Sequence, residues 1–245
     1  MERHTKLIGS AILRLYILSI LFCSSAVYLF SEGCTTAGTT VYVDDSNTVG
    51  PWNGTQDYPF RYIMDGIAAA NPGDTVFVSS GTYTENVVIT KNLTLTGADK
   101  ESTFIDWGGN GRALYLDGSE TNQIWVEVSG FTIQHAGGSG FACVVCSYII
   151  NGAITSTKIL DSLEGDGIQS YHCQGMTLSN NLISGNKMAG ISASLSGGNT
   201  ITSSIILYNP LLSHRCRNDR AYGGYFLDVH PLDEEAIGTG TERKI

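Results

Sequence analysis

The densest group of residues able to do chemistry is the segment DSLEGDG, which carries Asp161, Glu164 and Asp166. Carboxylate oxygens gathered on one bend are the ligands that Ca²⁺ prefers in proteins. The competing interpretation is a solvated bend, because the whole chain is acidic, with 23 Asp and Glu residues against 14 Lys and Arg. We favour the solvated bend, keep these three residues as candidate calcium ligands, and expect no other cofactor.

A second group is the pair Cys143 and Cys146, spaced as Cys-x-x-Cys within FACVVC. Such pairs hold zinc when two of them occur, or do redox chemistry when one opens a helix. Here one pair lies in a strand-like segment, where residues three apart point to opposite faces. Zinc binding and a bond between these two thiols are therefore disfavoured. His135 and His172 have no obvious partner and are interpreted as isolated surface histidines.

The net charge of the chain and its Asn-x-Thr triplets indicate which partners and modifications to expect. Residues 1–34 contain three basic and two acidic residues, which leaves 11 basic against 21 acidic residues in the rest. Without a basic patch for a phosphate backbone, nucleic acid is not expected as a partner. Asn53 and Asn92 stand in Asn-x-Thr triplets and are candidate glycosylation sites if the chain is secreted.

Internal repeats show how the chain could position these residues. One landmark is an apolar segment that recurs at offsets of 27, 23 and 23 residues. A second landmark, Gly followed by Phe or Ile at 140–141, 167–168 and 190–191, keeps the same offsets. The apolar segments are VSGFTI (128–133), TSTKIL (155–160), LSNNLI (178–183) and ITSSII (201–206).

About 23 residues per repeat suits three short strands and three bends. Strands this short cannot form hairpins of their own, so each would pair with its equivalent one repeat away, as in a solenoid. The fold class is therefore all-β, a single-stranded parallel β-helix. Asn180, Asn181 and Asn186 are expected at bends, where Asn tolerates left-handed backbone and can bond to its equivalent in the next coil. The expected inward side chains are Phe131, Ile133, Leu160, Ile183 and Ile206.

The register makes a prediction about the thiols. The offset of 27 relates Cys146 to Cys173 and would place them in adjacent coils about 4.8 Å apart. An oxidising exterior would permit a disulfide between them, and the alternative is a pair of reduced thiols in the core. The same register puts His172 opposite Val145, away from His135.

The segments at the two ends of the repeat region lack the repeat pattern. Asp57 and Pro59 could begin a helix over 57–73, with Phe60, Ile63 and Ile67 on one face, which would cap the open end of the solenoid. Beyond Asn209 the landmarks stop, and residues 210–245 are either an irregular cap or the product of a truncated or frameshifted repeat array.

The first segment directs the chain to a membrane. Arg3, Lys6 and Arg14 precede the apolar stretch 15–30, a pattern typical of a secretory signal. The stretch is slightly short for a transmembrane helix of roughly 20 residues. We expect residues 1–34 to be a signal peptide or an uncleaved signal-anchor. The protein would then be secreted or held at the cell surface, touching the membrane only through this segment.

Within segment 41–106, Pro72-Gly73-Asp74 is followed by the segment Gly81–Asn86, with the sequence GTYTEN. In this order the two motifs resemble the opening of secreted right-handed parallel β-helix proteins of the pectin-lyase-like superfamily, which includes NosD-type and surface-repeat proteins. With the coils that follow, the resemblance covers 41–209. It implies a right-handed β-helix domain with an N-terminal capping helix, and it leaves activity open because this fold carries lyases, hydrolases, esterases and non-enzymes.

The motifs of the superfamily's enzymes are missing from the coils. Galacturonan hydrolases resemble one another in Asn-Thr-Asp and Gly-His-Gly motifs, which do not occur here, and Arg is missing between Arg112 and Arg215. We therefore expect a non-catalytic scaffold that binds polysaccharide or a cell-surface glycan, or that serves a structural or adhesive role. The alternative is a calcium-dependent polysaccharide lyase or glycoside hydrolase acting on acidic glycans.

Overall fold

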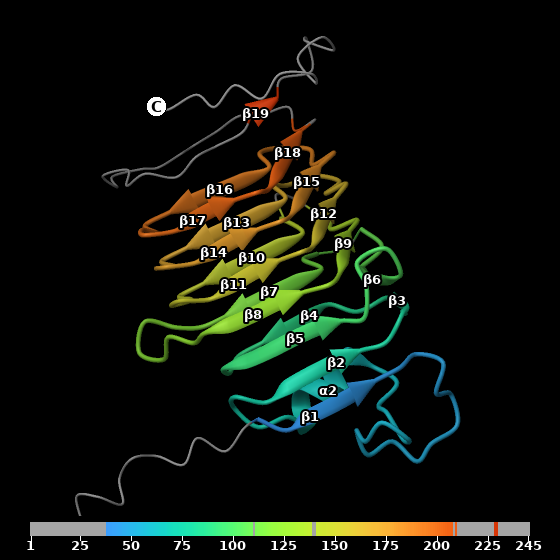
Figure 1. Cartoon of the computed structure of the whole chain (residues 1–245). Coiled ribbons are helices and arrows are strands. Elements are labelled where there is room, and N and C mark those ends of the chain that lie inside the picture. The colour runs from blue at the N-terminus through green and yellow to red at the C-terminus, as the bar shows by residue number, and fades with distance from the viewer. Residues whose placement is uncertain (1–37, 110, 139–140, 208, 210–227, 230–245) are drawn as a thin grey trace, which may run out of the picture. The chain divides into compact units, whose positions relative to one another are not determined.

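The computed structural model describes residues 38–109, 111–138, 141–207, 209 and 228–229. The expected signal segment 1–34 and most of the tail 210–245 lie outside the described residues. Within the described part, parallel strands form three sheets, and successive passes of the chain stack on one another (Figure 1). No helix in this part is long and apolar enough to cross a membrane.

From β2 to β16 each pass contributes one strand to each of the three sheets in turn, and we name these sheets A, B and C. Sheet A contains β1 (Thr40–Val43), β2 (Thr75–Val78), β5 (Leu93–Gly97), β8 (Val126–Ser129), β11 (Ala153–Thr155), β14 (Thr177–Ser179) and β17 (Thr200–Thr202). Sheet B contains β3 (Gly81–Tyr83), β6 (Thr103–Asp106), β9 (Thr132–Gln134), β12 (Lys158–Leu160), β15 (Leu182–Ser184), β18 (Ile205–Leu207) and β19 (Asp228–Val229). Sheet C contains β4 (Val87–Ile89), β7 (Leu114–Asp117), β10 (Val144–Ser147), β13 (Ile168–Tyr171) and β16 (Ile191–Ser194). The predicted parallel β-helix is therefore confirmed.

The interior is filled by aliphatic side chains that alternate with outward polar ones. Val128, Ile133, Ile154 and Ile183 are at most 1% exposed and stack coil upon coil. Alternation with period two is what a strand with one buried face requires.

The prediction that Leu160 points inward was wrong. Ile159, fully buried, pairs with Ile133 and Ile183, while Leu160 points outward between Gln134 and Ser184. The offsets along the inner column of sheet A are 26, 24 and 23, from Val128 to Ile154, Leu178 and Ile201. The expected offsets of 27 and 23 span the same 50 residues, so on sheets A and B the error is a one-residue slip in a single repeat.

The bends between sheets A and B explain the Ser and Asn residues of the repeats. From β8 to β18 each of these bends has two residues, and the first has a positive φ: 78° at Gly130, 50° at Ser156, 56° at Asn180 and 49° at Ser203. The second residue points inward. At that position Asn181 accepts from the backbone N of Thr157 and donates to the carbonyl of Ile154. Asn186 occupies the next bend and donates to Oδ1 of Asn209 one coil later, as expected for an asparagine ladder.

The capping helix α2 (Ile63–Ala69) is shorter than the expected 57–73. It packs on β1, β2 and β4, with Ile63, Gly66 and Ile67 buried. Asp57 does not cap it. Instead, the carboxylate of Glu85 accepts hydrogen bonds from the backbone N of Ile63 at 2.8 Å and of Met64 at 3.0 Å. The glutamate of the Gly81–Asn86 segment thus holds the helix on the first coil.

Candidate functional site

The bend after sheet C carries three aromatic rings from two adjacent coils, which we call the aromatic corner. β10 ends at Ser147 and β13 at Tyr171, and the residues that follow, Tyr148 and His172, have φ values of 53° and 52°. Because both take the same left-handed bend conformation, their side chains leave the coil in the same direction, one coil apart.

The rings of the aromatic corner are in direct contact. Tyr148 and His172 stack with centroids 4.8 Å apart and planes within 3°. Tyr171, 42% exposed, meets His172 edge-on at 4.2 Å and Tyr148 at 6.0 Å. Aromatic rings with one exposed side offer an apolar surface next to polar tips. Such a surface suits the C–H faces and hydroxyl edges of sugar rings.

A guanidinium lies at the opposite edge of sheet C. Arg112, in the connection before β7, lies over the ring of Tyr115 at 4.7 Å and over that of Phe141 at 4.9 Å. Both faces of the guanidinium are therefore covered by rings. Its Nε is buried and has no hydrogen-bond partner. Burial raises the pKa of the Tyr115 hydroxyl, which stays protonated and available as a donor.

A carboxylate–imidazole pair lies on the edge between sheets B and C. Oδ2 of Asp106 lies 2.8 Å from Nε2 of Gln134 and 2.9 Å from Nδ1 of His135. Partial burial acts to raise the pKa of Asp106, but hydrogen bonds from Gln134, His135 and the backbone N of Gly108 outweigh it and lower that pKa. The expectation that His135 lacks a partner was therefore wrong.

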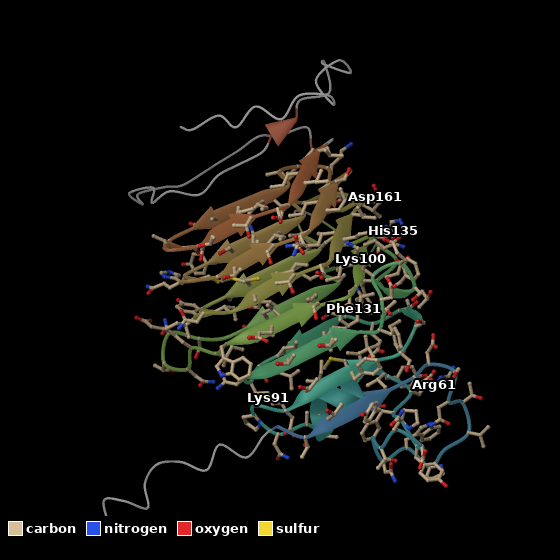
Figure 2. All side chains as sticks on the ribbon, viewed as in Figure 1. Arg61, Lys91, Lys100, Phe131, His135 and Asp161 are labelled. Atoms are coloured by element: carbon tan, nitrogen blue, oxygen red, sulfur yellow. The ribbon has the colours of Figure 1, made fainter. Side chains whose placement is uncertain are left out.

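The three predicted calcium ligands are not brought together as a site. Asp161 and Glu164 are exposed, and Asp161 occupies the bend position of the coil after His135, on the same edge (Figure 2). Asp166 accepts hydrogen bonds from the backbone N of Ala189 at 2.8 Å and from Oγ of Ser192 at 2.5 Å. Its carboxylate is thus occupied in joining two coils. The described residues contain no group of three or more His, Cys, Asp or Glu side chains placed to hold a metal ion.

The sequence left two alternatives open for Cys146 and Cys173, a disulfide or a pair of reduced thiols in the core, and the register on which the disulfide depended was wrong. Cys146 pairs with Ser170 in the sheet register, so Cys173 is not stacked on it. Cys173 lies at the inward position of the bend, and its thiol donates to the carbonyl of Cys146 at 3.3 Å. Cys143, Cys146 and Cys173 are buried and free in the structure. Burial raises the pKa of Cys143 to about 12, which keeps this thiol protonated.

The two candidate glycosylation residues differ in environment. Asn53 is exposed in the loop between β1 and α2, and its Oδ1 accepts from the backbone N and hydroxyl of Thr55. Asn92 is half-buried before β5, and its Oδ1 accepts from the backbone N of Trp125 at 3.0 Å. Asn92 therefore ties adjacent coils together through its Oδ1, whereas Oδ1 of Asn53 makes only local contacts within its own loop.

Sequence reasoning missed the aromatic corner because the expected offset at sheet C was wrong by three residues. The expected offset of 27 placed His172 opposite Val145, whereas the true offset of 24, from Val144 to Ile168, places His172 opposite Tyr148. The signal was available in the sequence, since Ser147-Tyr148 and Tyr171-His172 are both strand ends followed by an aromatic side chain.

Comparisons with solved structures return β-helix enzymes at low similarity. "Pectin methylesterase PemA from Erwinia chrysanthemi" is 13% identical over 74% of this chain and 68% of its own, with a TM-score of 0.37. A rhamnogalacturonan lyase is 14% identical over 79% and 66%, with a TM-score of 0.39. The GH136 lacto-N-biosidase from Eubacterium ramulus is 12% identical over 67% and 45%, with a TM-score of 0.39. Values this low carry no argument about activity.

A search of curated proteins finds no match to the chain. A family match is found over the coils. The family described as "Protein of unknown function (DUF1565)" matches residues 46–216, which includes the coils from β2 to β18 and the aromatic corner. Because this match spans well over half of the sequence, the chain belongs to the DUF1565 family of β-helix proteins.

Proposed function

We propose that this protein is a secreted or cell-surface scaffold that binds polysaccharide without cleaving it. The ligand lies along the outer face of sheet C and stacks on the aromatic corner. The observation that carries the proposal is the contact between Tyr148, Tyr171 and His172, three rings gathered from two coils with Tyr171 42% exposed.

The rest of the face supports the same assignment. Between the aromatic corner and Arg112, the outward side chains of sheet C include Tyr115, Ser147 and Gln169, which can donate or accept hydrogen bonds. Asp117 also faces outward and pairs with Ser147, so a glycan would meet ring faces, neutral polar groups and this carboxylate. Binding sites that combine an apolar surface with a few placed polar groups are common for sugars and other small ligands.

The first experiment is a glycan array on the secreted protein, followed by titration of the best oligosaccharide. Tyr171→Ala should weaken binding about tenfold, which corresponds to about 1.4 kcal/mol. Tyr58→Ala is the matched control, since Tyr58 is 47% exposed on the loop before α2 and belongs to the opposite end of the coil stack. Equal affinities of Tyr171→Ala and the unchanged protein would contradict the proposed site.

The charge of the ligand is a second question for the same titration. The guanidinium of Arg112 is covered on both faces by Tyr115 and Phe141, so only its edge can meet a ligand. An edge-on guanidinium binds a carboxylate through two parallel hydrogen bonds. Arg112→Gln should weaken binding of uronate-containing oligosaccharides more than binding of neutral ones.

The enzymatic alternative has one specific observation in its favour, the Asp106–His135 pair. The carboxylate holds Nδ1, which leaves Nε2 of a 41% exposed imidazole free to accept a proton. Incubation with polygalacturonate or alginate, with and without calcium, would detect cleavage as new reducing ends or unsaturated products. Turnover that is lost in His135→Ala would replace the binding proposal with a catalytic one.

A further inference from the structure

The outer face of sheet A carries a regular array of side-chain hydroxyls. The strands of this sheet alternate buried and outward residues, and from β2 to β17 the outward ones are mainly Thr and Ser. We call this array the hydroxyl face. Its members are Thr75, Thr94, Thr96, Ser129, Thr155, Thr177, Ser179, Thr200 and Thr202.

The strand register arranges the hydroxyl face in two straight columns. One column is unbroken over five strands and runs Thr96, Ser129, Thr155, Ser179, Thr202. The second runs from Thr75 and Thr94 through Glu127 and Ala153 to Thr177 and Thr200. Neighbours in a column are about 4.8 Å apart, and the two columns are about 6.6 Å apart along the strands.

These hydroxyls are not used to hold the protein together. In the part of the chain that the structure describes, none of the nine takes part in a side-chain hydrogen bond. Hydroxyls elsewhere do: Thr132 donates to the carbonyl of Lys100, Thr157 to that of Thr155, and Ser204 to that of Thr202. The hydroxyl face therefore presents donors and acceptors to the outside on a rigid support.

Strand propensity does not explain the array. Thr is favoured in strands generally, and that preference would act on all three sheets alike. The outward positions of sheet B instead include Phe104, Lys158 and Leu182, and those of sheet C include Tyr115 and Tyr171. The concentration of Thr and Ser on sheet A is specific to that face.

We propose that the hydroxyl face binds ice. A crystalline lattice of water repeats its oxygen atoms along one axis at nearly the spacing of stacked strands, so one column of hydroxyls can meet successive lattice positions. Threonine methyl groups exclude liquid water between these anchors. The parallel coils hold the columns straight, and five strands in register extend the match over about 19 Å.

Other occupants fit the hydroxyl face less well. The two columns contain no aromatic ring from β5 to β17 on which a sugar could stack, and the one charged member, Glu127, provides no counter-charge for an anionic ligand. The aromatic residues Tyr42 and Phe77 continue the long column below Thr96 and mark its end. The hydroxyl face is nearly neutral and regularly spaced, and ice is a neutral ligand with regularly spaced oxygen atoms.

The test measures thermal hysteresis and ice recrystallisation in dilute solutions of the whole protein. The unchanged protein should slow recrystallisation at micromolar concentration, and Thr155→Tyr, which breaks the middle of the long column, should lose at least tenfold of that potency. Ser184→Tyr is the matched control, because Ser184 is an outward residue of β15 on sheet B. Glu127→Thr should raise the potency by filling a gap in the shorter column.

Thermal unfolding of each variant checks that it is folded. If Thr155→Tyr does not fold, Glu127→Thr still tests the proposal. No effect of the unchanged protein on ice, beyond that of albumin at the same concentration, would overturn the proposal. Equal losses in Thr155→Tyr and Ser184→Tyr would overturn the assignment to this face. Glycan binding by Thr155→Tyr should be unchanged, since the aromatic corner lies on another sheet.

Discussion

At the scale of single residues, the bends decide which side chains reach the surface. A left-handed backbone costs a residue with a Cβ roughly 1–2 kcal/mol, and glycine escapes that cost. His135, Tyr148 and His172 nevertheless occupy such positions, with φ between 52° and 55°. Their large side chains leave the coil at the corner, where they are free to contact other coils or a ligand. Residues retained despite strain are candidates for function.

The Asp106–His135 pair gives a prediction about pH. Because the pKa of Asp106 is lowered below its usual value of 3.8, the folded state favours the ionised carboxylate. Its stabilisation is fully present above that value and is lost as the pH falls through the lowered pKa. Asp106→Asn should therefore lower the free energy of unfolding by about 1 kcal/mol at pH 7. The difference from the unchanged protein should vanish in acid.

Urea unfolding between pH 2 and pH 7 measures this difference. Asp57→Asn is the control, since Asp57 is exposed and makes no side-chain hydrogen bond within the described residues. A deficit of Asp106→Asn that stays constant down to pH 2 would show that the carboxylate does not act through its charge.

At the scale of elements, the sequence was sufficient to predict the coils and insufficient to fix their register. The repeat length and the Thr, Ile and Val runs predicted stacked parallel strands, which the sheets confirm. The slip arose in KIL (158–160), where Ile159 and Leu160 are both apolar and either could point inward. The neighbouring bend could not set the register either, because its left-handed position has no constant residue type: it is Gly130, Ser156 or Asn180 in successive coils. At sheet C the expected offset of 27 exceeds the true offset of 24 by three residues, so the stacking of Tyr148 on His172 was not predicted.

The inward bend residues should be essential to the coils. The side chain of Asn181, 2% exposed, accepts a hydrogen bond from the backbone N of Thr157 and donates one to the carbonyl of Ile154. Asn181→Leu would leave both groups buried without partners, at roughly 1–3 kcal/mol each. We expect a loss of about 2–4 kcal/mol in thermal or urea unfolding. Asn180→Gly is the comparison, because it keeps the bend and relieves the left-handed backbone; a similar loss there would place the effect in the bend rather than in the hydrogen bonds.

The cap depends on a carboxylate supplied by the first coil. Glu85→Ala would remove the acceptor for the backbone N of Ile63 and Met64 and should cost about 1–2 kcal/mol. Burial raises the pKa of Glu85 above its usual 4.5, so its ionised form is disfavoured on folding. Glu85→Gln, which still offers an acceptor without a charge, should be milder than Glu85→Ala.

The pH dependence separates these two effects of Glu85. The stability of the unchanged protein relative to Glu85→Gln should fall as the pH rises from 4.5 through the raised pKa, and then level off. Asp57→Asn, at an exposed acid of the loop before the helix, is the control and should follow the unchanged protein. A relative stability that rises over this interval would contradict the burial argument.

At the scale of the whole molecule, a solenoid is stabilised by contacts between neighbouring coils, so its ends are weaker than its middle. One end of the described stack is covered by α2, and the inward side chains there are buried, as at Val43 and Val76. Toward the other end Ile191, Ile201 and Ile206 are half-buried, in contrast to fully buried Ile154. The two ends should therefore differ in local stability even though they are built from the same repeat.

Hydrogen exchange of the native protein should display this asymmetry. Backbone amides of β8 to β12 should exchange most slowly, because they lie between coils whose interior is fully buried. Amides of β17 and β18 should exchange faster by an order of magnitude or more, whereas those of β2, although also close to an end, should stay protected beneath the cap. Glu85→Ala should accelerate exchange in β2 and leave β17 unchanged, since coils communicate only through their neighbours. Uniform protection from β2 to β18 would mean that the coils unfold as one unit, with no separate role for the cap.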